Sequence, residues 1–174
     1  MQGKFAVRLL VVSSALLAAA SAGSAQTKVA IINLQRAVLE SAEIKKASTE
    51  LEAKFKPRQA AIEKLQREIQ GIQQNLQTNA GKLTPQAEAD LTAQGQRKQR
   101  ELTRDTEDLQ ADVDRERNEI LSKSSQRMQE VVKKLAEQKG IEVVVDISNT
   151  VYFKPDLEIT TESIAAYDKA YPVK

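Results

Sequence analysis

The chain has 174 residues, of which 29% are charged and only 3% aromatic, and it contains no histidine, cysteine or tryptophan. Because histidine and cysteine supply most acid–base, thiol and metal-ligand chemistry, this composition argues against an enzyme, and we expect no catalytic residue, metal site or cofactor. The formal net charge of +2 becomes zero once Lys4 and Arg8 near the N-terminus are left out, so a cationic nucleic-acid-binding protein is not indicated.

Residues 1–25 have the pattern of a signal peptide. Two basic residues precede an apolar stretch, residues 9–20, that is too short to span a bilayer. Small residues at the end of the segment fit a cleavage between Ala25 and Gln26. The alternative is an uncleaved membrane anchor, for which the apolar run is short. We therefore expect an exported, soluble mature protein that forms one domain, residues 26–174.

The mature chain opens with a short predicted strand, residues 27–34 (TKVAIINL). Both of its faces are apolar, which is typical of a strand that is covered on both sides. Asn33 is the predicted N-cap of a short helix that starts at Leu34. Residues 27–43 therefore make the first part of a small β body.

Residues 44–139 form a predicted antiparallel helical hairpin. Their apolar side chains recur at gaps of three, four and seven residues, which is typical of the seam of a coiled coil. Apolar residues of the two arms also match when their numbers sum to 164, which leaves Ile69 opposite Gly95. The matching pairs are Ile44 with Ile120, Leu51 with Val113, Phe55 with Leu109, and Ile62 with Leu102.

The hairpin turns at residues 79–85. Gly81 can supply the positive φ that ends the first helix, and Thr84 can cap a second helix that begins at Pro85. The Gly81-Lys82 pair does not make a phosphate-binding loop, because the first glycine and the Ser or Thr of that motif are missing. The turn therefore carries no sign of nucleotide binding.

Pro57 lies inside the first arm of the hairpin. A proline within a helix removes one backbone hydrogen bond and crowds the preceding turn, so we expect a bend there. Two interpretations remain open: a fixed bend in a rigid arm, or a hinge that lets the outer part of the arm swing.

The C-terminal residues, 140–174, complete the predicted body. Residues 141–147 form a strand, and residues 151–153 return as its hairpin partner. Thr160 or Thr161 caps a short last helix. Because so small a body buries little apolar surface, we expect self-association to complete it. The fold class is α+β, mostly α, with a long coiled-coil hairpin projecting from a small β body.

Charge is unevenly distributed along the hairpin. Residues 58–104 carry eight basic and five acidic side chains, whereas residues 105–119 carry seven acidic and two basic ones. One interpretation is a solvated coiled-coil flank with ion pairs of little energetic value. The other is a basic outer surface that attracts acidic segments or anionic lipid head groups. Its candidate binding residues are Lys64, Arg67, Arg97, Lys98, Arg100 and Arg104.

These segments in this order resemble the Skp (OmpH-like) family of periplasmic chaperones. The resemblance covers essentially the whole mature chain. No single motif is diagnostic, but the combination of signal peptide, strand, long hairpin, strands and short helix is fairly specific. The stretches that carry it are residues 29–37, 55–58, 140–146, 151–152 and 156–161.

The resemblance implies a periplasmic homotrimer in which three hairpins enclose a cavity below a shared β body. The implied activity is ATP-independent holding of unfolded outer-membrane proteins on their way to the outer membrane. The alternative is a structural protein, an exported coiled-coil spacer or adaptor whose hairpin tip contacts one folded partner. Suppression of aggregation of several unrelated unfolded barrel proteins would separate the two.

Overall fold

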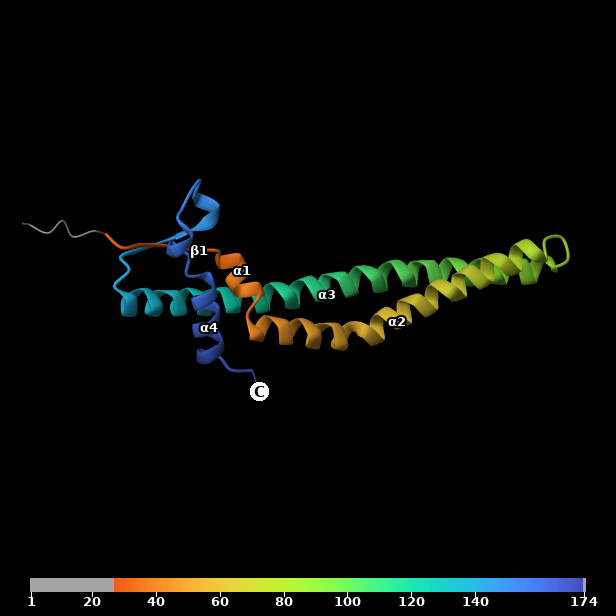
Figure 1. Cartoon of the computed structure of the whole chain (residues 1–174). Coiled ribbons are helices and arrows are strands. Elements are labelled where there is room, and N and C mark those ends of the chain that lie inside the picture. Colours follow the sequence, from red (N-terminus) through yellow and green to blue (C-terminus); the bar gives the residue numbers. More distant parts are fainter. Residues whose placement is uncertain (1–26, 174) are drawn as a thin grey trace, which may run out of the picture.

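The computed structural model describes residues 27–173, and two long helices dominate it. Helices α2 (Ala42–Thr78) and α3 (Pro85–Lys139) run side by side as an arm, and the other elements gather near one end as a small body (Figure 1). This is the predicted α+β, mostly helical fold with a projecting hairpin. The predicted signal peptide lies outside the described residues. Within those residues, no helix combines the length and the apolarity that crossing a bilayer requires.

The sheet of the body joins the two ends of the described chain. Strands β1 (Val29–Ile32) and β2 (Val143–Asp146) pair in parallel, although the whole arm separates them in sequence. Helix α1 (Leu34–Leu39) follows β1 directly. The side chain of Asn33 accepts a hydrogen bond from the N–H of Arg36, which confirms the predicted cap.

The predicted strand pair between residues 141–147 and 151–153 is wrong. β2 pairs with β1 and ends at Asp146, whose carboxylate accepts a hydrogen bond from the N–H two residues on and so starts a short 3-10 turn, η1 (Ile147–Asn149). Residues 151–153 form no strand. The loop from η1 to η2 (Pro155–Leu157) instead projects from the body (Figure 1).

The last helix, α4 (Thr160–Ala170), is anchored to the sheet through its first residue. Its N-cap is Ile159, which makes no side-chain capping bond, so the predicted cap at Thr160 or Thr161 is wrong. The hydroxyl of Thr160 is used elsewhere: it accepts a hydrogen bond of 2.9 Å from the backbone N–H of Asn33. This bond ties the start of α4 to the end of β1.

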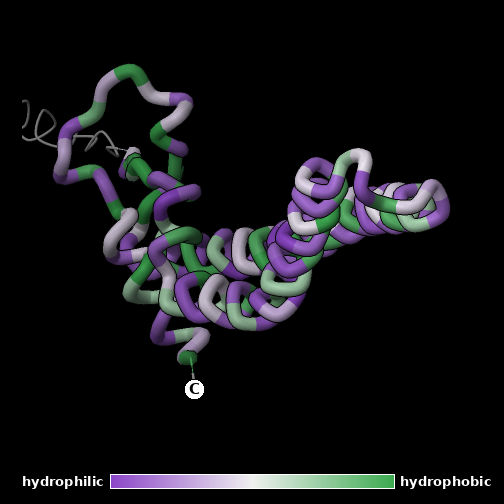
Figure 2. The backbone as a smooth tube through the Cα atoms, turned by 90° about the vertical axis from the view of Figure 1, so that its right-hand side faces the viewer, coloured by the Kyte–Doolittle hydropathy of each residue, from purple (hydrophilic) through white to green (hydrophobic). Residues whose placement is uncertain are grey.

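The core of the body lies where α1, α3 and α4 meet the sheet. Met128 of α3, Tyr167 of α4 and Ala37 of α1 are fully buried, and Ile32 and Val38 are nearly so. In the arm, hydrophobic and hydrophilic residues alternate along both helices (Figure 2). The arm therefore has a buried seam but no core of its own beyond it.

The tip of the hairpin is where the sequence placed it. α2 ends at Thr78, and α3 begins at Pro85 after the predicted capping hydrogen bond to Thr84. Gly81 has a φ of +73°, the left-handed conformation that glycine adopts without strain. It lies within the loop, however, because the C-cap of α2 is Asn79.

The arms are antiparallel, but their register differs from the predicted sum of 164. A Cβ on Gly95 would lie 3.4 Å from Ile72, not against Ile69. The hydrogen-bonded ion pair between Arg58 and Asp112 sums to 170. In these two contacts the partner of a given residue is thus displaced by three to six residues, about one to two helical turns, from the predicted pairing. Apolar residues alone mislead here, because polar residues also occupy the seam.

α2 continues through Pro57 without interruption. The helix nevertheless changes direction in its first half, where its colour passes from orange to yellow in Figure 1. A bend is therefore present in the part of the helix that contains the proline, as the sequence predicted. Whether this bend moves stays a prediction.

Candidate functional site

Polar residues interrupt the apolar seam close to Pro57. Arg58 follows Phe55 by three residues and precedes Ile62 by four, so it occupies a seam position on α2. Asp112 occupies a half-buried position of the same kind on α3. The guanidinium of Arg58 lies 2.6 Å from the Asp112 carboxylate. This hydrogen bond holds the pKa of Asp112 below its usual value, with Arg115 adding to the effect.

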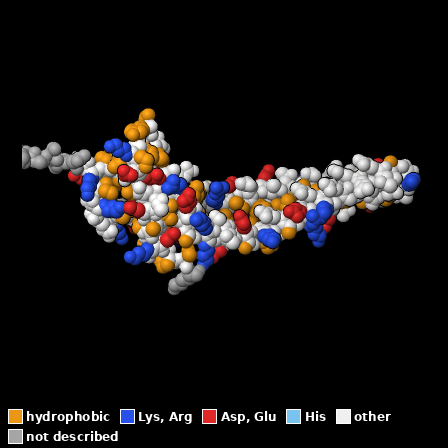
Figure 3. Space-filling view, in the orientation of Figure 1, with side chains coloured by type: hydrophobic (Ala, Val, Ile, Leu, Met, Phe, Trp, Pro, Cys, Tyr) orange, Lys and Arg blue, Asp and Glu red, His pale blue; other side chains and the backbone are white. Residues whose placement is uncertain are grey.

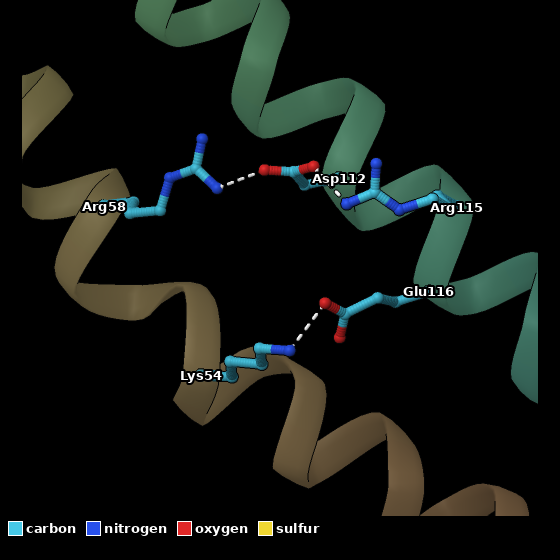
Figure 4. Close-up of polar contacts among 5 residues, drawn as sticks. All are labelled: Lys54, Arg58, Asp112, Arg115 and Glu116. Carbon is cyan, nitrogen blue, oxygen red and sulfur yellow. Dashed lines mark hydrogen bonds and ion pairs between the residues drawn. The ribbon is translucent and has the colours of Figure 1, made fainter.

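A second ion pair joins the arms on the body side of Pro57. Lys54 lies 2.5 Å from Glu116, and Arg115 lies 2.5 Å from the carboxylate oxygen of Asp112 that Arg58 does not contact (Figure 4). The Lys54 and Arg58 contacts thus flank the proline on both sides. Each pair is partly exposed, so it orients the arms more than it stabilises them.

Lys98 is the one predicted binding residue that the structure uses between the arms. Its ammonium lies 2.5 Å from Glu68 of α2, and its side chain is only 25% exposed. The hydrogen bond lowers the pKa of Glu68 and raises the pKa of Lys98. Lys98 therefore lies at the junction of the arms, where it is less available to a ligand than an exposed residue.

The other five predicted residues are all exposed. Lys64 and Arg67 lie 3.9 Å from acidic residues four positions away on their own helix, and Arg104 lies 3.3 Å from Asp105. Arg97 and Arg100 make no ion pair or hydrogen bond within residues 27–173. Among the candidate binding residues, these two arginines are therefore the most available to a ligand.

The five exposed basic residues do not form one patch. Arg97, Arg100 and Arg104 are spaced by three and four residues and share the side of α3 turned away from α2. Lys64 and Arg67 likewise share the side of α2 that is turned away from α3. The two groups lie on the outer faces of different helices, so the single basic surface that the sequence indicated is divided in two.

The root of the arm is fixed to the body by a polar cluster that sequence reasoning missed. Glu43, in the first turn of α2, accepts a hydrogen bond from the hydroxyl of Tyr167 and lies 2.6 Å from Arg127. The N–H of Ala42 donates to Asp168 over 2.9 Å. Burial, and then the hydrogen bond to Glu43, raise the pKa of Tyr167 to about 12. The arm therefore leaves the body from a fixed base.

A cavity of about 590 Å³ lies between α1 and α3 at this root. Its apolar lining includes Leu39, Leu121 and Ile147, and Arg117 also lines it. Leu39 remains 43% exposed. A smaller cavity of about 70 Å³ shares three of these residues and continues the hollow toward α2.

Large apolar side chains are also exposed at the sheet and on the projecting loop. Val29 and Val143 are paired in register across the two strands, and they are 38% and 46% exposed. Val151 is fully exposed and Tyr152 is 81% exposed. Figure 3 shows hydrophobic side chains on the part of the body that projects above the arm. Such a patch is unusual on a small monomer and marks a contact surface.

The sequence and the structure both match known proteins over most of the chain. A family model described as outer membrane protein (OmpH-like) matches residues 28–167. The chain is 30% identical over 149 residues to the chaperone protein Skp of Salmonella typhimurium, which covers 85% of this chain and 90% of that protein. It is 25% identical over 157 residues to the Skp-like protein of Pseudomonas aeruginosa, covering 90% and 93% of the two chains.

A solved structure has the same fold. It is described as an OmpH-like outer membrane chaperone from Caulobacter crescentus, and it superposes with a TM-score of 0.72 over 87% of this chain and 90% of that one. The two sequences are 20% identical. At that identity the likeness supports the fold alone.

Proposed function

The chain belongs to the OmpH-like family of outer membrane proteins, and we propose that it is an ATP-independent periplasmic holdase chaperone for unfolded outer-membrane β-barrel proteins. The observation that carries the proposal is the long two-helix arm on a small body, together with homology to proteins named chaperone protein Skp. An arm of this kind offers a large surface and no deep catalytic cleft. Such an arm suits a protein that binds its partner without catalysing a reaction.

A homotrimer would complete the small body. β1 has β2 on one side and a single bridge to Glu158 on the other, so the outer edge of β2 is left without a strand partner in residues 27–173. The loop residues Val151 and Tyr152 are strongly exposed. We infer that residues 151–153 of one copy cover the β2 edge of the next, since open edges and apolar patches both need cover. Three arms would then project from one shared body.

The exposed basic residues would attract clients from a distance. Charges on the arm raise the rate of encounter with acidic segments, and salt weakens this effect. The two unoccupied arginines, Arg97 and Arg100, would contribute most, followed by Lys64, Arg67 and Arg104. The same side chains, with Lys82 at the tip, would make transient contacts with anionic lipid head groups. A swing at Pro57 would adapt the arm to clients of different size.

Release of the client needs no nucleotide in this proposal. The turn lacks a phosphate-binding loop, as the sequence shows around Gly81. Each single contact with the client is weak and breaks easily, but many such contacts over several arms together hold the client strongly. Insertion of the client into the outer membrane would then draw it away.

Light scattering tests the proposal. Several unrelated β-barrel proteins are diluted out of urea with and without the purified protein, in the absence of ATP. A holdase keeps each of them from aggregating at a stoichiometric ratio. A structural spacer would leave the scattering unchanged, and that result would overturn the proposal.

The contribution of charge needs a separate variant. Reversal of Arg97, Arg100 and Arg104 to glutamate should slow association with a client and reduce its salt dependence. Unchanged association kinetics would remove the electrostatic part of the proposal and leave the holdase part intact.

A further inference from the structure

One side of the outer hairpin is lined by uncharged amide and hydroxyl side chains. All of them are exposed, and we call this set the amide face. The two arms contribute to it at positions that repeat at seven and alternate by three and four, which keeps them on one side of each helix. Its members are Gln59, Gln66, Gln70 and Gln73 on α2 and Gln96, Gln99, Thr103, Thr106 and Gln110 on α3.

Contacts between the arms show that this side is distinct from the charged one. The pair of Glu68 and Lys98 lies on the opposite flank of the seam, and these two residues share the lining of a hollow with Asn75 and Gln94. The flank of α2 that carries Glu68 and the flank of α3 that carries Lys98 therefore lie on the same side of the hairpin. The remaining flanks of the two helices, which carry the amide face, meet on the other side.

Most of the amide groups of this face are available for binding; the exception is Gln110, which donates to Asp114 over 2.9 Å. Within residues 27–173, the side chains of Gln59, Gln66, Gln73 and Gln99 make no hydrogen bond. The one charged residue between residues 59 and 73 on this side is Glu63, which is paired with Arg67. On the face of the arm that Figure 3 shows, few red or blue side chains are seen toward the tip, whereas they are more frequent on the inner half and the body.

We propose that the amide face binds the exposed backbone of an extended, unfolded polypeptide; the inference rests on the proposed chaperone function. A primary amide carries two N–H donors and one carbonyl acceptor, so it can pair with both the C=O and the N–H of a peptide group. An unfolded client exposes many such groups, which its folded state would satisfy internally. The match is between the chemistry of the surface and that of a peptide backbone, so it does not depend on client sequence.

The low charge of this face, where Glu63 is paired with Arg67, gives it a specific use. Gln59, Gln66 and Gln73 are spaced by seven residues, about 10.5 Å along the helix, which corresponds to about three residues of an extended chain. A client segment laid along the arm would therefore meet an amide repeatedly and in any register. Uncharged contacts also accept acidic and basic clients alike. The basic residues on the outer faces attract the client, and the amide face holds it.

Matched alanine variants test the inference. Gln66, Gln73, Gln96 and Gln99 are replaced together by alanine, and the control replaces Lys64, Arg67, Arg97 and Arg100. All eight residues are exposed, lie on the same two helices, and can be replaced by alanine without loss of helix propensity. Fluorescence anisotropy then measures the affinity for a labelled, urea-denatured β-barrel protein at low and at high salt.

We expect the amide variant to bind about tenfold more weakly at both salt concentrations, because uncharged hydrogen bonds are not screened. The basic control should weaken binding at low salt and match the unmodified protein at high salt. An amide variant that binds like the unmodified protein at both salts would overturn the inference. If the unmodified protein itself binds no client, the proposed function fails instead.

Site-specific cross-linking gives an answer even if the alanine variant folds poorly. The chain contains no cysteine, so one introduced cysteine carries a photoreactive label at a known place. Gln66→Cys and Gln99→Cys lie on the amide face, and Lys64→Cys and Arg97→Cys lie two residues away on the other side of each helix. We expect client adducts from the first two alone. Equal adducts from all four, or adducts between copies of this chain, would contradict the inference.

Discussion

Arg58 and Asp112 face each other across the seam of the hairpin, with 2.6 Å between a guanidinium nitrogen and a carboxylate oxygen. Both stand where a coiled coil places an apolar residue. The pair follows Pro57 by one residue, so the seam loses apolar contact where the arm bends. A polar pair in a seam fixes register at a cost in stability.

Replacing both residues by leucine should therefore strengthen the seam. The variant Arg58→Leu with Asp112→Leu is expected to unfold at a higher temperature than the unmodified protein, because an apolar pair replaces a partly desolvated ion pair. Thermal unfolding followed by circular dichroism measures this. Each single leucine variant leaves one charge without its partner, and should be less stable than the double variant. A lower melting temperature for the double variant would show that the ion pair stabilises the arm.

Pro57→Ala tests whether the bend is a hinge. Alanine restores the missing backbone hydrogen bond, so the outer arm should be straighter and its position more uniform. Spin labels on Ala80→Cys at the hairpin tips report the spread of tip-to-tip distances in the oligomer. We expect a narrower distribution in the alanine variant. A shifted distribution of the same width would instead identify a fixed bend.

Met128 is fully buried where α3 crosses the body. Met128→Ala should lower the free energy of unfolding by about 2–5 kcal/mol, because the truncated side chain leaves a cavity in a small core. Denaturant unfolding measures the change. Leu109→Ala in the half-buried seam of the arm is the matched control, and we expect a smaller loss there. Equal losses would mean that body and arm unfold as one unit with similar packing.

Asp146 makes stability depend on pH. Its carboxylate accepts hydrogen bonds from Ser148 and from the N–H of Leu34, which hold its pKa below the usual value. A lowered pKa in the folded state stabilises the fold above the unfolded pKa of about 3.9, and this contribution is lost as pH falls below it.

Asp146→Asn should therefore cost about 1 kcal/mol of unfolding free energy at neutral pH. The difference from the unmodified protein should shrink below about pH 4, where the carboxylate itself becomes protonated. Urea unfolding across this pH range measures the difference. Ser148→Ala, which removes one donor and leaves the carboxylate, should show a smaller effect with the same pH profile. A difference that persists unchanged in acid would contradict the assignment.

Tyr152→Glu tests the proposed contact between copies. Tyr152 is 81% exposed on the projecting loop, so the change should leave the folded chain intact. If this loop covers the β2 edge of a neighbour, a buried charge there should weaken the oligomer. Sedimentation velocity compares the variant with the unmodified protein and with Lys154→Glu, a charge change on an exposed neighbour. An unchanged oligomer in the Tyr152 variant would place the contact elsewhere.

The amino-acid sequence determined the local structure of this protein. Helix ends follow from single residues: from the capping side chains of Asn33 and Thr84, and from the left-handed backbone of Gly140 that ends α3. The hairpin itself follows from the spacing of apolar residues, since only a helix brings residues three and four apart onto one side. The bend near Pro57 follows from a missing backbone donor. Each of these features depends on residues that are close in sequence.

Only the tertiary structure decided which distant residues meet. The register of the arms brings Arg58 and Asp112 into contact, which apolar spacing does not reveal. The partner of β2 is β1, more than a hundred residues away in sequence, and not the segment at 151–153. Lys98 forms an ion pair with Glu68 because the two arms bring their side chains to within 2.5 Å of each other. The amide face likewise exists only once two helices lie side by side, because one half comes from α2 and the other from α3.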